Sequence, residues 1–309
     1  MKVPSSEAAN GKRGTGRGLR QRPVELEDWL NRRVFHPLSH RLALALCRTP
    51  VSPNMVSAAG GMAVALAAIC YGFISYPMSA LAGLLLHLSW HVLDGADGDL
   101  ARMTGRVSPF GEFVDGLFDY LGHIVVYLVL LMLVAPKLGA WALPLVAMAA
   151  FGRAAQQNFF ETVRRSYEFW VYDRAWLATT TTDRSGTGDA TIAQRLVRRY
   201  LDGAGSMLPE VARLNARFAQ PAATGRREEV RDTVLRHRAA LLAGLAPFGS
   251  NQRTLALALA MLVQMPVLYL LYEAIALNLA LAVAIRRKRA LLQSVIRQVD
   301  GDQPSSTER

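Results

Sequence analysis

The stretch that decides the fold is DGADGDLARMTGRVSPFGEFVDGLFDY, residues 94–120. It contains the aspartates Asp94, Asp97, Asp115 and Asp119, and strongly apolar residues flank it on both sides. The first two are three positions apart and the last two are four apart, so each pair projects from one side of its own helix. A charge at the centre of a membrane-spanning helix costs about 2.5 to 3.5 kcal/mol on insertion scales, which makes these residues candidates for a functional site.

Two helices that meet across a short turn would bring the four carboxylates together, and such carboxylates repel one another unless cations neutralise them. Hard oxygen ligands select magnesium, manganese or calcium over zinc. Gly98, Ala101 and Gly111 are small and leave room for a ligand or a neighbouring backbone, while Arg102 supplies a cation for a phosphate. Helix capping or solvated loop carboxylates would explain neither the spacing nor the small residues. The stretch therefore indicates an intramembrane cation site.

The composition of the whole chain is that of a membrane protein. Of its 309 residues, 51% are hydrophobic and 19% are charged, which is too apolar for ordinary soluble domains of this length. The formal net charge is +11, but the Lys and Arg residues fall outside the apolar runs, so the charge indicates topology rather than nucleic-acid binding. With Cys47 and Cys70 as its only cysteines, the chain supports neither a disulfide scaffold nor a cysteine-built metal site.

Apolar runs of about twenty residues predict an all-α, polytopic membrane protein with six transmembrane helices and an N-terminal amphipathic interfacial helix. Ser52 followed by Pro53 is typical of a helix start, and a break is expected between Gln264 and Pro266. The expected segments are a disordered basic tail at 1–23, a juxtamembrane amphipathic helix at 24–47, spans 1–4 at 48–163, a cytoplasmic insertion at 164–240 with short amphipathic helices such as 192–201, spans 5–6 at 241–290, and a C-terminal tail at 291–309.

The distribution of basic residues predicts the orientation. Lys and Arg gather at the N-terminus, around Arg102, in the insertion and after the last apolar run. By the positive-inside rule, both termini and the aspartates face the cytoplasm, and we expect a multi-pass protein of a bacterial plasma membrane. Arg153 and Arg253 fall near the cytoplasmic ends of apolar runs, where each could bind a phosphate on an acceptor or extend to lipid headgroups. Three histidines on the same spans are interpreted as hydrogen-bonded packing residues: His87, His91 and His123.

The spacing of the motif resembles a known signature. The pattern DxxDGxxAR, eight residues, G, three residues, D, three residues, D is that of the CDP-alcohol phosphotransferases, and all eight fixed positions match: Asp94, Asp97, Gly98, Ala101, Arg102, Gly111, Asp115 and Asp119. The six apparent spans, the amphipathic entry helix and the Pro53 and Asn54 pair are also similar to this family. The insertion at 164–240 is longer than the resemblance leads us to expect.

The resemblance implies transfer of a phosphatidyl or other substituted phosphoryl group from a CDP-linked donor, CDP-diacylglycerol in the leading hypothesis, to a small alcohol acceptor. CMP is released, and the reaction belongs to phospholipid synthesis. The implied cofactors are two divalent cations, Mg²⁺ or Mn²⁺, bound by Asp94, Asp97, Asp115 and Asp119, with Asp119 also acting as general base. The implied nucleotide pocket consists of Asp94, Gly98, Ala101, Arg102 and Gly111. Membrane lipid is a further partner, a homodimer is usual for proteins of this kind, and no nucleic-acid partner is expected.

Other functions fit the same residues. A soluble CDP-headgroup donor with a lipid alcohol acceptor would use the same motif in the reverse arrangement. A cation channel or transporter could also line its ion path with intramembrane carboxylates, and a degenerate enzyme could serve as a structural subunit. The sequence does not identify the acceptor alcohol, although Arg153 and Arg253 favour one that carries a phosphate.

Overall fold

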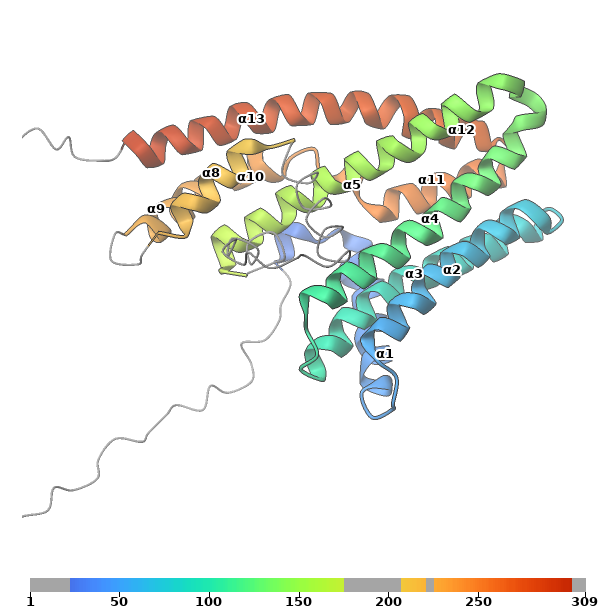
Figure 1. Ribbon diagram of the computed structural model, residues 1–309, viewed down its shortest axis with the longest axis horizontal. Coiled ribbons are helices and arrows are strands. Elements are labelled where there is room, and N and C mark those ends of the chain that lie inside the picture. The colour runs from blue at the N-terminus through green and yellow to red at the C-terminus, as the bar shows by residue number, and fades with distance from the viewer. Residues whose placement is uncertain (1–22, 175–206, 221–224, 302–309) are drawn as a thin grey trace, which may run out of the picture.

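In a computed structural model the chain folds into helices that are arranged along one long axis (Figure 1). The structure describes residues 23–174, 207–220 and 225–301, and within these ranges it contains no strand. The basic tail up to residue 22 and the amphipathic helix expected at 192–201 therefore lie outside the described residues. The helices are η1 (Val24–Leu26), η2 (Asn31–Phe35), α1 (His36–Leu46), α2 (Pro53–Phe73), α3 (Met78–Met103), α4 (Pro109–Leu138), η3 (Gly139–Trp141), α5 (Ala142–Tyr172), α8 (Pro209–Phe218), α9 (Arg226–Arg236), α10 (Arg238–Leu242), η5 (Ala246–Phe248), α11 (Ser250–Leu262), α12 (Pro266–Leu271), η6 (Tyr272–Ala276) and α13 (Leu277–Gly301).

Close packing of α2 against both α3 and α4 forms the part of the bundle that carries the aspartates (Figure 1). A Cβ atom placed on Gly61 of α2 would lie 2.6 Å from the backbone oxygen of Phe118 in α4. In the other direction, a Cβ atom on Gly122 would lie 2.7 Å from the backbone oxygen of Gly61. Glycine at both positions lets the two backbones approach closely. This contact fixes the position of α4 along the axis of α2.

The helices that begin beside the aspartates share one type of N-terminal cap. The Ser52 hydroxyl accepts a hydrogen bond from a backbone N–H in the first turn of α2, and Pro53 occupies the first helical position. Ser108 caps α4 in the same way, accepting from the Gly111 N–H at 3.0 Å, and proline again follows the cap. A serine cap satisfies an otherwise unpaired donor, and proline at this position loses no hydrogen bond. The predicted start at Ser52 and Pro53 is confirmed.

α4 and α5 form a long antiparallel pair that turns at Gly139, where φ is +55° (Figure 1). α5 continues to Tyr172 instead of ending with its apolar run near residue 163. Arg164 pairs with Glu161 at 2.6 Å and with Glu168 at 3.0 Å, and such i,i+3 and i,i+4 pairs stabilise a helix on its polar surface. Likewise α13 is helical to Gly301, beyond the position where a tail was expected.

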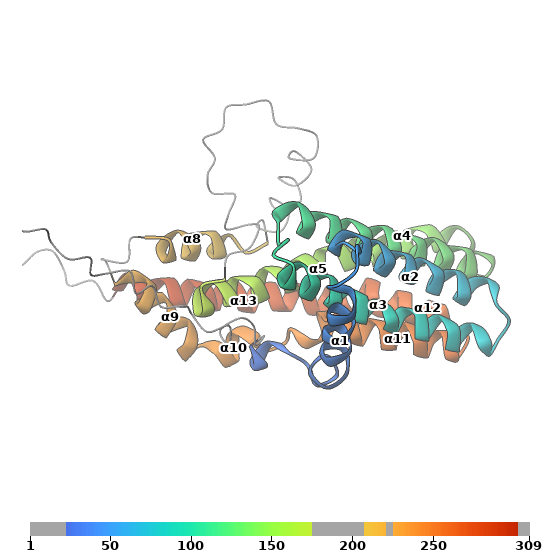
Figure 2. The same cartoon turned by 90° about the horizontal axis from the view of Figure 1, so that it is seen from below.

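The outer ends of α5 and α13 extend past the bundle, and α8, α9 and α10 pack against them (Figure 2). These short helices belong to the segment interpreted as an insertion, and they bury a second hydrophobic core. Trp170, Phe218 and Val299 are among its most buried side chains. The described part of the insertion is therefore a folded unit built on two helices of the bundle.

Three helical segments of the described residues are long and apolar enough to cross a membrane: Pro53–Phe73, Phe110–Tyr172 and Pro266–Gly301. The second of these contains the turn at Gly139 and thus both arms of the α4–α5 pair. α3 is not among the three because its histidines and aspartates lower its mean hydropathy, and α11 has only 13 residues. The expected break lies between α11 and α12, where Gln264 has a φ of +55°. The count of six spans is not confirmed by this measure.

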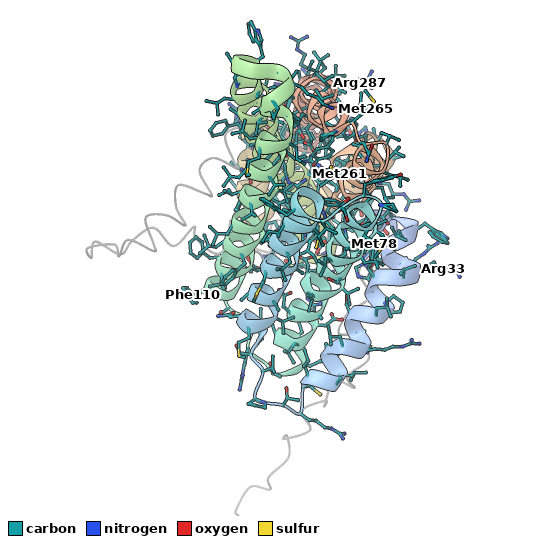
Figure 3. All side chains as sticks on the ribbon, turned by 90° about the vertical axis from the view of Figure 1, so that its right-hand side faces the viewer. Arg33, Met78, Phe110, Met261, Met265 and Arg287 are labelled. Carbon is teal, nitrogen blue, oxygen red and sulfur yellow. The ribbon has the colours of Figure 1, made fainter. Side chains whose placement is uncertain are left out.

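Large apolar side chains cover the outer surface of the bundle. They recur at helical spacing on α2, α4 and α11, and the exposed ones include Met62, Leu66, Ile69, Phe73, Leu121, Ile124, Leu128, Met132, Leu255, Leu259 and Leu262. In the view along the bundle, Phe110 and Arg33 lie on opposite sides of it (Figure 3). Soluble monomers rarely expose contiguous apolar surface on this scale, so the outer face is suited to lipid.

The entry segment differs from the single helix expected at 24–47. η1 is separate, and the continuous helix begins near residue 29 and runs through η2 and α1 to Leu46. Asp28 causes this start, because its carboxylate accepts from the Asn31 backbone N–H at 2.8 Å. Trp29 is 65% exposed, as an interfacial residue would be, but Phe35 is buried and stacks on His91 at a centroid distance of 4.8 Å.

Candidate active site

The junction of α2, α3 and α4 brings the motif residues to one end of the bundle. α3 ends at Met103, and Gly105 adopts a φ of +67° in the short connection before α4 begins. After this connection α4 packs against α2, as α3 does, and side chains of α3 and α4 meet beside it, as the hydrogen bond between Trp90 and Asp119 shows. The geometry expected from the spacing of the aspartates therefore requires a five-residue connection at 104–108 and a glycine with positive φ.

Asp97 of α3 and Asp115 of α4 are two carboxylates that interact with each other. Asp97 is 6% exposed, and its Oδ2 accepts a hydrogen bond from the Ser57 hydroxyl of α2 at 2.6 Å. Its side chain also interacts with the Asp115 carboxylate of α4. Two neighbouring carboxylates repel unless a proton or a cation lies between them. The pair therefore has the chemistry of a cation site.

Asp119 lies one turn beyond Asp115 on α4, and the two carboxylates interact electrostatically. Its Oδ1 accepts a hydrogen bond from the Trp90 indole N–H at 2.7 Å. Asp94 lies one turn before Asp97 on α3, and its side chain is exposed. The structure thus brings Asp97, Asp115 and Asp119 together, whereas Asp94 lies at the surface of the same helix.

The donors at this junction are all carboxylate oxygens, which fits Mg²⁺ or Mn²⁺ and does not fit a thiolate-bound or imidazole-bound metal. Within the described ranges, no three His, Cys, Asp or Glu side chains already have the arrangement of a metal site. The interaction of Asp115 with the buried Asp97 is the observation that supports a cation here, because it brings a second negative charge to a carboxylate that water does not solvate.

Two of the small residues of the motif have specific neighbours. A Cβ atom on Gly98 would lie 3.3 Å from the Arg102 guanidinium, which folds back over this glycine. A Cβ atom on Gly111 would lie 3.7 Å from Oδ1 of Asn54, so the start of α2 borders the start of α4. Ala101 is half-buried on α3. Arg102 is ion-paired with Asp99, and its Nε is buried without a hydrogen-bond partner.

Arg153 and Arg253 lie deeper in the bundle and converge on one carboxylate, Glu273 of η6. Arg253 donates to Glu273 at 3.4 Å and to Gln156 at 2.8 Å, and it is 1% exposed. Arg153 lies 3.9 Å from Glu273, contacts His123 at 2.6 Å and has a side chain that is 12% exposed. Neither arginine extends to the surface of the bundle as a lipid-facing residue would. Two guanidinium groups to one carboxylate leave an excess of positive charge in this buried cluster.

Several residues at the site carry no clear signal in the sequence. Ser57 and Trp90 contact the aspartates from α2 and α3, but serine and tryptophan inside apolar helices are more often packing residues. Glu161 of α5 pairs with Arg164 and with Arg165, and Arg165 also lies 3.4 Å from Glu112 at the start of α4. Of these residues, only Glu161 could have been identified from the sequence as a candidate, because it is a charged residue within the apolar part of α5.

The fold and the site define an all-helical protein with an oxygen-rich acidic site at the junction of apolar helices. Residues 50–168 match the family model described as CDP-alcohol phosphatidyltransferase. This match covers α2 to α5 and includes every position of the aspartate motif. The chain therefore carries a CDP-alcohol phosphatidyltransferase domain at residues 50–168, as the motif predicts.

Curated relatives include an archaetidylinositol phosphate synthase of Aeropyrum pernix, which is 40% identical over 91 residues that make up 28% of this chain and 45% of the relative. A second synthase of this name, from Pyrococcus horikoshii, is 37% identical over 89 residues, or 29% of this chain and 45% of the relative. The bifunctional IPC transferase and DIPP synthase of Archaeoglobus fulgidus is 31% identical over 111 residues, or 36% of this chain and 21% of the relative. The matches thus span less than half of each relative.

Proposed function

We propose that the protein is a metal-dependent membrane transferase that moves a phosphatidyl group from CDP-diacylglycerol to an alcohol, releasing CMP, in phospholipid synthesis. The single observation that carries the proposal is the interaction of the buried Asp97 carboxylate with the half-buried Asp115 carboxylate inside a CDP-alcohol phosphatidyltransferase domain. Such a pair is costly unless it serves a cation, and the family acts on a nucleotide diphosphate that divalent cations bind well.

Divalent cations, when bound, would neutralise the donor diphosphate and the charge that develops on the departing CMP. Asp94, Asp97, Asp115 and Asp119 would hold them. The Arg102 guanidinium would bind a phosphate oxygen of the donor, while Gly98, Ala101 and Gly111 leave space for the nucleotide. Their side of the bundle is also where α2 and α4 begin, so the N–H groups of two helix starts face the same region.

Asp119 would take the proton from the acceptor hydroxyl. The freed oxygen attacks the lipid-linked phosphorus, a new P–O bond forms, the bond to the bridging oxygen of the diphosphate breaks, and CMP leaves with that electron pair. Because Trp90 already engages one oxygen of Asp119, the other oxygen is available for this proton. The proposal thus separates the roles of the carboxylates: three hold cations and Asp119 also handles the proton.

The acceptor is proposed to carry a phosphate of its own. The cluster of Arg153, Arg253 and Glu273 has two cations for one anion, and an uncompensated charge in a low-dielectric setting favours an anionic ligand. Arg153 is the better placed of the two, because its side chain retains some exposure and Arg253 has almost none. The names of two relatives, both synthases of an inositol phosphate lipid, support an acceptor of this class.

We further propose that all six helical arms cross the membrane, with the aspartates at the cytoplasmic end. α2, the two arms of the α4–α5 pair and the α12–α13 segment supply four spans, and α3 and α11 pack beside them. Val107 lies in the α3–α4 connection and is 64% exposed, whereas Trp141 lies at the opposite turn and is 78% exposed. In a cysteine-free background, V107C should react with a membrane-impermeant maleimide only from the cytoplasmic side, and W141C only from the other. Labelling of both from one side would refute this topology.

The transferase activity is tested by incubating purified protein with Mg²⁺ or Mn²⁺, one CDP-linked donor and one alcohol, and measuring CMP. CDP-diacylglycerol with phosphorylated and unphosphorylated acceptors is one arm, and soluble CDP-headgroup donors with lipid alcohols form the other. Asp119→Asn should abolish CMP release, whereas Asp173→Asn, which changes an exposed ion pair with Arg227, should retain it. Arg153→Gln should raise KM for a phosphorylated acceptor and leave KM for the donor unchanged. Absence of CMP with every donor would refute the transferase, and metal-dependent ion flux would then favour a channel.

A further inference from the structure

Trp90 makes a direct contact with the proposed general base although it lies outside the aspartate motif. It projects from α3, and its indole N–H donates to Oδ1 of Asp119 on α4 at 2.7 Å. Trp90 is 4% exposed, so its N–H must find an acceptor within the protein. The hydrogen bond fixes which of the two Asp119 oxygens remains free, and it does so from a different helix.

The indole itself has little freedom to move. The distance between ring centroids is 4.5 Å from Trp90 to His91 and 5.6 Å from Trp90 to His87. The His123 ring packs edge-on, with its centroid 5.1 Å from that of Trp90. From α2, a Cβ atom on Gly60 would lie 3.4 Å from Cδ1 of Trp90, so glycine leaves the space that the indole fills. The three histidines therefore enclose the Trp90 side chain by packing against it, and we interpret them as packing residues rather than metal ligands.

A second contact holds the backbone of Asp119. Nδ1 of His123 lies 2.7 Å from the Asp119 carbonyl oxygen, and Nε2 of His123 lies 2.6 Å from a guanidinium nitrogen of Arg153. Arginine can only donate, so Nε2 of His123 accepts and Nδ1 carries the proton that it donates to the Asp119 carbonyl. Asp119 is thus held at its side chain by Trp90 and at its carbonyl by a histidine whose tautomer Arg153 determines.

We propose that Trp90 is a positioning residue that holds the Asp119 carboxylate in the orientation required for cation binding and proton transfer. The inference rests on the proposed function and deepens it, because it assigns a role to a residue outside the motif. Groups that orient a metal-binding side chain typically change metal affinity or activity by about 10- to 100-fold when they are removed. Trp90 has the geometry of such a group: it is buried, enclosed and bonded to one defined oxygen.

The test compares Trp90→Phe with a matched control, Trp170→Phe. Trp170 is 1% exposed and donates its indole N–H to Oδ1 of Asn215, also at 2.7 Å, in the second hydrophobic core. Both variants lose the same atoms and one buried hydrogen bond, so their losses of thermal stability should be similar. Mn²⁺ affinity is measured by titration of the detergent-purified protein, and kcat and KM are measured for CMP release.

For Trp90→Phe we expect Mn²⁺ affinity and kcat to fall by about 10- to 100-fold while KM for the CDP-linked donor changes little. Trp170→Phe should match the wild type in all three. Equal Mn²⁺ affinity and equal kcat for the two variants would overturn the proposal. If the wild type binds Mn²⁺ but releases no CMP, the transferase proposal fails, and the difference in Mn²⁺ affinity between the variants still decides the role of Trp90.

Discussion

Replacing Glu273 by glutamine is expected to destabilise the protein severely without changing the shape of the side chain. Glu273 is fully buried, accepts from Arg253 at 3.4 Å and from the Tyr269 hydroxyl at 2.9 Å, and lies 3.9 Å from Arg153. After the change the Arg253 guanidinium stays buried with its Gln156 hydrogen bond but without a counter-charge. Breaking one partner of a buried pair costs about 3 to 5 kcal/mol. At 1.36 kcal/mol per tenfold change, this lowers the folded-to-unfolded ratio by about two to four orders of magnitude.

The assay is reversible unfolding of the purified protein in mixed micelles, with Asp300→Asn as the control. Asp300 pairs with Arg217 at 2.6 Å, but its side chain is 46% exposed, so the loss of that pair should cost less than about 1 kcal/mol. Removing Glu273 and Arg253 together, in Glu273→Leu with Arg253→Met, should be less destabilising than Glu273→Gln alone, because Arg253 then no longer remains as a buried unpaired charge, while Arg153 loses Glu273 in both variants. An equal loss of unfolding free energy in Glu273→Gln and in the control would refute this prediction. So would a double variant whose loss equals the sum of the losses of its two single variants.

Three further outcomes follow from the same contacts. Asp97→Asn should raise the melting temperature in the presence of a chelator, because it relieves repulsion from the Asp115 carboxylate. The same change should weaken the stabilisation that Mn²⁺ gives, and thermal unfolding with and without Mn²⁺ tests both results. Gly61→Ala should cost about 1 to 3 kcal/mol, since the new Cβ would meet backbone at 2.6 Å, whereas Gly116→Ala, with open space around it, should be neutral or stabilising in the same unfolding assay. Burial alone would raise the pKa of Glu25, but hydrogen bonds from the Tyr172 and Tyr167 hydroxyls help lower it below its usual range. Its stabilising effect is thus present above about pH 4.3 and is lost as the pH falls through the folded-state pKa, so the protection factors of the residue 24–35 amides, taken against the intrinsic exchange rate at each pH, should fall on acidification in the wild type but not in Glu25→Gln.

The parts of the site that the sequence predicts are those encoded by spacing within one helix or between consecutive helices. The pairing of the motif aspartates on two consecutive helices follows from helical periodicity, and the connection between α3 and α4 is short, as expected. The helix start at Ser52 and Pro53 is local chemistry, and it is confirmed by the cap that the serine side chain makes. The aspartate motif was also sufficient to predict the family, which the match over residues 50–168 confirms.

Contacts between distant parts of the chain could not be predicted in this way. Ser57 meets Asp97 across 40 residues of sequence, and His91 meets Thr254 across 163. Whether a serine in an apolar helix packs, caps or binds a carboxylate depends on the rotation of that helix against its neighbours, and the pattern of apolar residues fixes this rotation only coarsely. Arg253 illustrates the same limit, since its position near the end of an apolar run was compatible with both a surface and a buried side chain, and η6 supplies the glutamate that keeps it buried.

α3 shows how functional polar residues lower the mean hydropathy of a helix that lies among apolar helices. Some of the polar residues that lower the hydropathy of α3 are covered by neighbouring helices: Ser57 of α2 covers Asp97, and the buried His91 contacts Thr254 of α11. The outward residues of α3, by contrast, remain apolar, with Leu81 and Leu85 more than half exposed. Asp97 thus avoids lipid because a neighbouring helix covers it, and the insertion cost of its carboxylate is offset by packing and, in the proposed enzyme, by cations. Mean hydropathy, which is averaged along the helix, therefore excludes α3 from the membrane spans in part because of residues that neighbouring helices keep out of lipid.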